Sequence, residues 1–197
     1  MRRSILSLIL QNISVTVYLI MINIFLLIFV LAVTFFRPEY IDYIALNPGN
    51  IFQGKYLWTF LTSMFMHAGF LHLFVNMFVL FSLGGFCEKI IGKKRFLIFY
   101  IISGIIAGLT FVVLAGAFGN SVLGERIFGS PMTSAVGASG AIFAIAGLFV
   151  VLTPKLKFTI IFFPFFSPPP YIMIPLALFA TWLVSAGANL PIGNSAH

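Results

Sequence analysis

The chain has 197 residues, of which 61% are hydrophobic and only 8% are charged, and its mean hydropathy is +1.13. So few polar side chains cannot cover a water-soluble globule of this size, which excludes a soluble domain and indicates a polytopic membrane protein. The net charge of +7 does not indicate nucleic-acid binding, because the cations lie beside apolar runs and no basic stripe with interleaved aromatic residues is present.

Apolar segments long enough to form membrane helices recur along the chain. A spanning helix needs about 20 mostly apolar residues. The candidate spans are residues 14–36, 70–86, 96–118, 139–152 and 171–190, with a sixth beginning near residue 192. The fourth is short, which fits a helix whose first residue already lies below the membrane surface. The sequence therefore predicts an all-α polytopic bundle that forms a single domain over residues 1–197.

The segments around these spans are expected to lie at the membrane surfaces. The first span has a long apolar run without a small-residue cleavage site, so we expect an uncleaved helix. Residues 41–53 are mixed in polarity and are expected to form a short amphipathic element in the outer interface. Residues 156–166 are apolar but short, and three prolines follow at 168–170, which predicts an interfacial loop.

Lysine and arginine give the expected orientation. If the spans alternate, most of these cations fall on one side of the membrane: Arg2, Arg3, Lys89, Lys93, Lys94, Arg95, Lys155 and Lys157. That side is cytoplasmic by the positive-inside rule, which predicts a cytoplasmic N-terminus. The second, fourth and sixth spans then run inward, and four polar side chains fall in their first turns. These side chains are His72, Asn76, Ser139 and His197.

These four side chains share one layer near the outer surface, and their chemistry suggests a hydrolase. A serine hydroxyl is a weak nucleophile until a base removes its proton, and a neutral histidine suits that role near pH 7. Ser139 is the predicted nucleophile and His197 the predicted base. No aspartate lies in these spans, and the nearest acid, Glu88, is at the cytoplasmic end, so the arrangement is a dyad. The side chains of Asn76 and His72 are predicted to stabilise the oxyanion beside the Ser139 backbone N–H.

The same residues carry a family resemblance over roughly Trp58 to the C-terminus. The pattern is Gly137-Ala138-Ser139-Gly140 opening one helix, Ala196-His197 opening a later one, and His67-x4-His72-x3-Asn76 upstream. It resembles the rhomboid family of intramembrane serine proteases. The resemblance implies the same four catalytic roles, and cleavage of peptide bonds in or near transmembrane helices of membrane-protein substrates. It also implies an acyl-enzyme on Ser139, an active site that opens toward the outer face, and no metal or organic cofactor.

Small residues predict close packing around this site. Gly140, Ala144 and Gly147 lie on one face of the fourth span, and in rhomboids the partner of this face is the helix that carries the histidine. Gly104 and Gly108 give the third span a face for another close neighbour. Gly137 suits a loop that enters the membrane and turns sharply into a helix.

The chain also departs from the family pattern. Thr59 follows Trp58, where rhomboids commonly carry arginine, so we expect this loop to lack the usual arginine interactions. Phe143 stands where many members have tyrosine packed on the catalytic histidine, and phenylalanine keeps the stacking while losing the hydroxyl. The sequence stops at His197, and a sixth span would need about fifteen more apolar residues, so truncation is the expectation.

Several other readings remain beside the protease. His67 is expected to be a structural hydrogen-bonding group at the head of the second span. Zinc bound by the three histidines is an alternative, although no His-Glu-x-x-His motif is present. One aspartate in the whole chain excludes an aspartyl protease. A transporter remains open as a class, and the runner-up function is a catalytically inactive rhomboid-like protein that binds and escorts transmembrane helices.

Overall fold

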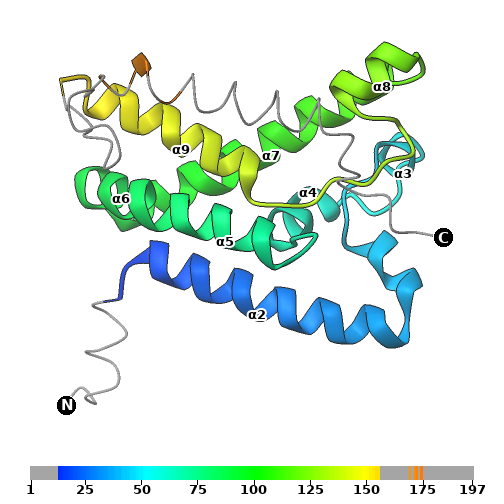
Figure 1. Cartoon of the computed structure of the whole chain (residues 1–197), viewed down its shortest axis with the longest axis horizontal. Coiled ribbons are helices and arrows are strands. Elements are labelled where there is room, and N and C mark those ends of the chain that lie inside the picture. The colour runs from blue at the N-terminus through cyan, green and yellow to red at the C-terminus, as the bar shows by residue number, and fades with distance from the viewer. Residues whose placement is uncertain (1–12, 156–168, 170, 173, 175–197) are drawn as a thin grey trace.

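The computed structural model describes residues 13–155, 169, 171, 172 and 174, which fold into helices joined by loops (Figure 1). In chain order the elements are α2 (Val15–Phe36), the 3-10 helix η1 (Pro38–Tyr43), α3 (Pro48–Phe52), α4 (Thr59–Thr62), the 3-10 helix η2 (Ser63–Phe65), α5 (Phe70–Val79), the π-helical segment η3 (Leu80–Gly84), α6 (Gly85–Ile91), α7 (Lys93–Phe118), α8 (Val122–Phe128) and α9 (Ser139–Leu152).

Three of these helical stretches are long and apolar enough to cross a membrane: Val15–Phe36, Phe70–Ile91 and Lys93–Phe118. The apolar helix Ser139–Leu152 is shorter, with the bounds predicted for the fourth span. The second span continues to Ile91, past the predicted end at residue 86, so the helix also includes the charged residues that follow residue 86. The predicted loop at 156–166 and sixth span lie outside the described residues, as does nearly all of the fifth span.

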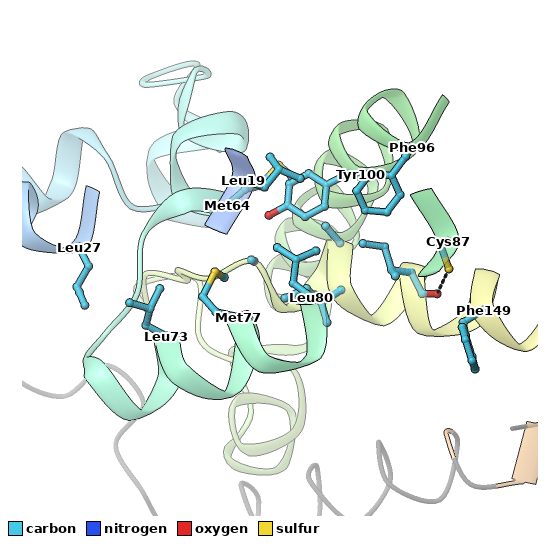
Figure 2. Close-up of a cluster of buried hydrophobic side chains, with 14 residues drawn as sticks. Leu19, Leu27, Met64, Leu73, Met77, Leu80, Cys87, Phe96, Tyr100 and Phe149 are labelled. Carbon is cyan, nitrogen blue, oxygen red and sulfur yellow. Dashed lines mark hydrogen bonds between the residues drawn. The ribbon is translucent and has the colours of Figure 1, made fainter. Parts of the chain in front are cut away.

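The continuous helix α5–η3–α6 lies between α2 and α9, while α7 packs along α9 (Figure 1). Its buried side chains join those of α2, α7 and α9 in one apolar core (Figure 2). Leu80, Phe96, Tyr100 and Ile145 are fully buried there. The bundle therefore holds α5 and α9, which begin with the candidate site residues, against each other.

One buried carboxylate ties α6 to the start of α2. Glu88 is only 5% exposed, and its Oε1 accepts a hydrogen bond from the Val15 N–H at 2.8 Å. Its Oε2 accepts from the Thr16 N–H at 2.8 Å and from the Thr16 hydroxyl at 2.7 Å. Ser14 accepts from the Val17 N–H, so the side chains of Ser14 and Glu88 together satisfy the first donors of α2.

The small residues of α9 and α7 allow close contacts within the described structure. A Cβ added at Gly140 would lie 2.4 Å from the Cβ of Ala107, so Gly140 admits α7, while the predicted packing of this face on the histidine-bearing helix lies outside the described residues and stays a prediction. Gly104 and Gly108 of α7 are covered by side chains from the segment between α2 and α5: Met64, Leu46 and Phe60. Glycine at these positions allows the loop side chains to reach the helix backbone.

We expect Gly140→Ala to lower the free energy of unfolding by about 2 kcal/mol, because the added methyl overpacks the contact with Ala107. The matched control moves the methyl across the interface, in the double variant Gly140→Ala/Ala107→Gly. Thermal unfolding in detergent micelles should show that the double variant is more stable than the sum of the single effects predicts. Additive effects would show that the two residues do not meet.

Candidate active site

Backbone hydrogen bonds join the loop that leads into α9 to the loop between α2 and α5. Leu46 and Ala135 exchange backbone hydrogen bonds of 3.1 and 2.8 Å, forming an antiparallel bridge. The Gly137 N–H donates to the Ser63 carbonyl at 2.9 Å. These bonds fix the chain immediately before Ser139, so the position of the hydroxyl depends on the loop between α2 and α5.

Asn47 strengthens the same junction. Its Nδ2 donates to the Met132 carbonyl at 3.1 Å and to the Ser134 hydroxyl at 3.2 Å. Its Oδ1 accepts from the Asn50 N–H at 3.2 Å, which caps the start of α3. One side chain therefore links α3 to the loop that precedes Ser139. Sequence reasoning did not identify Asn47, because an asparagine before a proline is also an ordinary helix cap.

Ser139 and His72 both lie close to Gly137. A Cβ built on Gly137 would lie 2.9 Å from His72 Cε1, 3.1 Å from His72 Nε2 and 3.8 Å from the Ser139 hydroxyl oxygen. The imidazole edge and the hydroxyl therefore converge on the space that a side chain at residue 137 would fill. Gly137 also has φ +129°, a conformation that other residues rarely adopt. The structure brings together these three residues, which the sequence assigned to one site.

Asn76 lies one turn after His72 on α5 and is buried. Its Nδ2 donates to the His72 carbonyl at 3.0 Å, a bond within the helix that orients the amide. An amide nitrogen carries two N–H groups, so one donor remains beyond this bond. Residues four apart share a helix face, which places Asn76 on the same side of α5 as His72.

Backbone donors add to these side chains at the start of α9. The first N–H groups of a helix have no acceptor within the helix, and in α9 these begin at Ser139. The positive end of the helix dipole favours negative charge at the same place. A hydroxyl, an imidazole and free backbone donors therefore occur together, which is an arrangement suited to attack on a carbonyl and to stabilisation of an oxyanion.

A cavity of about 220 Å³ lies between α7 and α9 and reaches Ser139. Its walls include Ser63, Gly104, Ala107, Phe111, Gly137 and Gly140. Water occupies about 30 Å³ per molecule in the liquid, so the space can hold several waters or an apolar side chain. Ser139 therefore borders open space within the helical bundle.

His67 differs from its expected role as a loop hydrogen-bonding group. The side chain is 5% exposed, and neither ring nitrogen has a hydrogen bond within the part of the chain that the structure describes. Its ring lies edge-on to that of His72, with ring centres 5.1 Å apart. Burial, followed by the neighbouring His72 ring, lowers the pKa of His67 to about 4, although the Phe65 backbone opposes the shift. The ring is therefore neutral at pH 7.

Two other predicted site residues are His197 and Phe143. His197, the predicted base, lies outside the described residues. Phe143, predicted to pack on its imidazole, is 48% exposed one turn along α9 from Ser139. Among residues 13–155 and the few described beyond them, no cluster of three histidine, cysteine or acidic side chains is placed to hold a metal ion. The predicted roles of His197 and Phe143 stay predictions.

Comparisons with known proteins concern the same region. The family model described as Rhomboid domain matches residues 54–197. The rhomboid protease GluP of Bacillus subtilis is 36% identical over 110 residues, which cover 55% of this chain and 18% of that protein. The rhomboid protease GlpG of Yersinia pestis is 28% identical over 156 residues, which cover 76% of this chain and 46% of that protein.

An inactive relative also matches. The inactive RHOMBOID-like protein 8 of Arabidopsis thaliana is 31% identical over 116 residues, which cover 55% of this chain and 32% of that protein. The matched segment spans less than half the length of each of these three relatives. Because the family model covers more than half of the chain and the fold is a helical bundle with apolar spans, the chain belongs to the Rhomboid family.

Proposed function

We propose that the protein is an intramembrane serine endopeptidase that cleaves peptide bonds in or near the transmembrane helices of other membrane proteins. The observation that carries this proposal is the convergence of the Ser139 hydroxyl and the His72 imidazole on Gly137, at the start of an apolar helix. Two relatives, GluP and GlpG, are named as rhomboid proteases, which supports the same chemistry.

In the proposed mechanism, His197 removes the proton from the Ser139 hydroxyl as the oxygen attacks the substrate carbonyl carbon. The carbonyl oxygen becomes an oxyanion, which accepts hydrogen bonds from His72, the Asn76 amide and the Ser139 backbone N–H. His197 then protonates the leaving amine, and water hydrolyses the acyl-enzyme on Ser139. These steps use a hydroxyl, an imidazole and amides, and need no metal or organic cofactor.

A substrate helix must unwind locally before the reaction, because its carbonyls are engaged in helix hydrogen bonds. We therefore expect helix-weakening residues near the cleaved bond. The bilayer surrounds the enzyme, and the substrate enters from it. Phe143 is proposed to pack on the imidazole of His197, and Gly140 to hold α9 close to α7.

The proposed orientation places the N-terminus in the cytoplasm and opens the site toward the outer face. The start of α2, the end of α6 and the start of α7 lie at one end of the bundle, where Lys93 donates to the Ile13 carbonyl at 2.8 Å. The basic residues 89 and 93–95 belong to this end, and the Ser139 end of α9 is the opposite one (Figure 1). Positive residues favour the cytoplasmic side.

Labelling with a serine-directed fluorophosphonate tests the proposal directly. We expect the purified wild-type protein to be labelled, and Ser139→Ala and His197→Ala to lose the label while keeping their helical circular dichroism. Ser130→Ala is a matched control, since it removes a serine hydroxyl from the loop that leads into α9 without touching the dyad. Absence of label in the folded wild-type protein would instead favour the runner-up, an inactive protein that binds transmembrane helices.

A further inference from the structure

The imidazoles of His67, which is buried, and His72, which is half-buried, lie together at the head of α5 and have an unexplained feature. Neither ring nitrogen of His67 nor Nδ1 of His72 has a hydrogen bond of good geometry among the described residues, although the Phe65 backbone acts on the His67 ring as an acceptor. A buried polar atom without a partner costs roughly 1–3 kcal/mol, so these three buried nitrogens need a reason. The two rings are themselves neighbours, edge to face, at an angle of 67°.

The separation of the rings suits a hydrogen bond between them. An N–H···N bond of about 2.9 Å between two imidazoles places the ring centres roughly 5 Å apart. The observed separation is 5.1 Å. The last side-chain torsion is broad in histidine, so either ring can rotate to bring a nitrogen toward the other ring.

We propose that His67 is a positioning residue, whose ring N–H donates a hydrogen bond to His72 Nδ1 and thereby holds the proton of His72 on Nε2. This inference rests on the proposed function, because an Nε2 proton matters only if that nitrogen must donate to an oxyanion. His72 Nε2 lies 3.1 Å from a Cβ built on Gly137, and the Ser139 hydroxyl oxygen lies 3.8 Å from the same point.

The chemistry of imidazole makes this link specific. A neutral imidazole has one N–H donor and one acceptor nitrogen, and the bond made by one nitrogen decides which tautomer is present. If Nδ1 of His72 accepts, Nε2 must carry the proton and becomes a donor toward the reaction site. His67 is suited to donate because its burial keeps it neutral, with one N–H available at pH 7.

The opposite arrangement is chemically distinct and measurable. The backbone of Phe65 also lies near the His67 ring and can take its N–H. His67 would then accept from His72 Nδ1–H, and Nε2 of His72 would be a bare acceptor that repels an oxyanion. The direction of one proton therefore separates a positioning role from a merely structural contact.

Nitrogen-15 NMR of the full chain in lipid, with all histidines labelled, tests the inference without any need for turnover. The chain has only three histidines, so single substitutions assign the six ring nitrogens. We expect His72 to carry its proton on Nε2 in the wild-type protein at pH 7. A proton on Nδ1 of His72 would overturn the inference, even if the enzyme is active.

Substitution of His67 provides a second test of the inference. His67→Phe keeps the size and burial of the ring but removes the donor, and we expect mixed tautomers at His72 and a kcat reduced about 10-fold to 100-fold, with KM little changed. His67→Asn and His67→Gln restore an amide N–H at the two positions of the ring nitrogens, and one of them should recover most of kcat. Which one recovers it identifies the donating nitrogen.

These outcomes separate the two proposals. An unaltered His72 tautomer in folded His67→Phe would overturn the positioning role of His67. Failure of Ser139 labelling in the wild-type protein would overturn the protease function, and the tautomer of His72 would still be measured. If His67→Phe does not fold, the wild-type spectrum alone decides whether His72 carries its proton on Nε2.

Discussion

Gly137→Ala is expected to reduce kcat for cleavage of a transmembrane substrate by at least about 100-fold while leaving the protein folded. The new methyl would lie 2.9 Å from Cε1 and 3.1 Å from Nε2 of His72, so the imidazole must shift from its position in the site. Alanine also strains a backbone with φ +129°. A displacement of about 1 Å at a reacting group costs roughly 100-fold in rate.

Gly54→Ala and Gly92→Ala are controls that separate the effect of backbone strain from the effect of a steric clash with a neighbouring side chain. Both glycines have positive φ, +72° and +86°, but an added Cβ at either meets nothing within 4 Å in the described structure. They should lose stability without a comparable loss of kcat. The measurement is the turnover of each variant in proteoliposomes, beside its thermal unfolding. A Gly137→Ala protein with more than a third of wild-type activity would show that the position of His72 is not critical.

The spans could be predicted from the sequence wherever burial follows local hydropathy. The apolar run and Ser14 predicted the start of α2, and the apolar run from Ser139 predicted α9 to the residue. The second span was predicted to end too early, since Glu88 and Lys89 look like the end of a membrane helix. In the structure Glu88 is buried because its partners lie at the start of α2, more than 70 residues away in the chain.

The candidate site shows the same limit. Depth in the membrane predicted that His72 and Ser139 would meet, because each begins an inward-running span. The sequence did not predict that Gly140 packs on Ala107, or that His67 is buried beside His72. The identity of a glycine or histidine in the sequence does not show which residue it contacts in the fold. Long-range packing determines that contact, and no local sequence pattern predicts it.

Glu88→Ala is expected to lower the free energy of unfolding by about 3 kcal/mol or more, which is the largest stability effect we predict. The substitution leaves the N–H groups of Val15 and Thr16 and the Thr16 hydroxyl without their acceptor, and each such loss costs roughly 1–3 kcal/mol when buried. It also removes a carboxylate from the positive end of the α2 dipole. Thermal unfolding in detergent micelles, followed by circular dichroism, measures the effect.

Glu125→Ala and Thr16→Val are the matched variants for Glu88. Glu125 is exposed in the first turn of α8, so its loss should cost less than about 0.5 kcal/mol. Thr16→Val removes one of the three donors and should cost about 1 kcal/mol, but much less when Glu88 is already alanine. Equal effects of Glu88→Ala and Glu125→Ala would contradict the stabilising role of the buried contact between Glu88 and the start of α2.

At a temperature where it is folded, Glu88→Ala should keep wild-type kcat, because this contact and Ser139 lie at opposite ends of the bundle. Loss of stability without loss of chemistry is thus the converse of the result expected for Gly137→Ala.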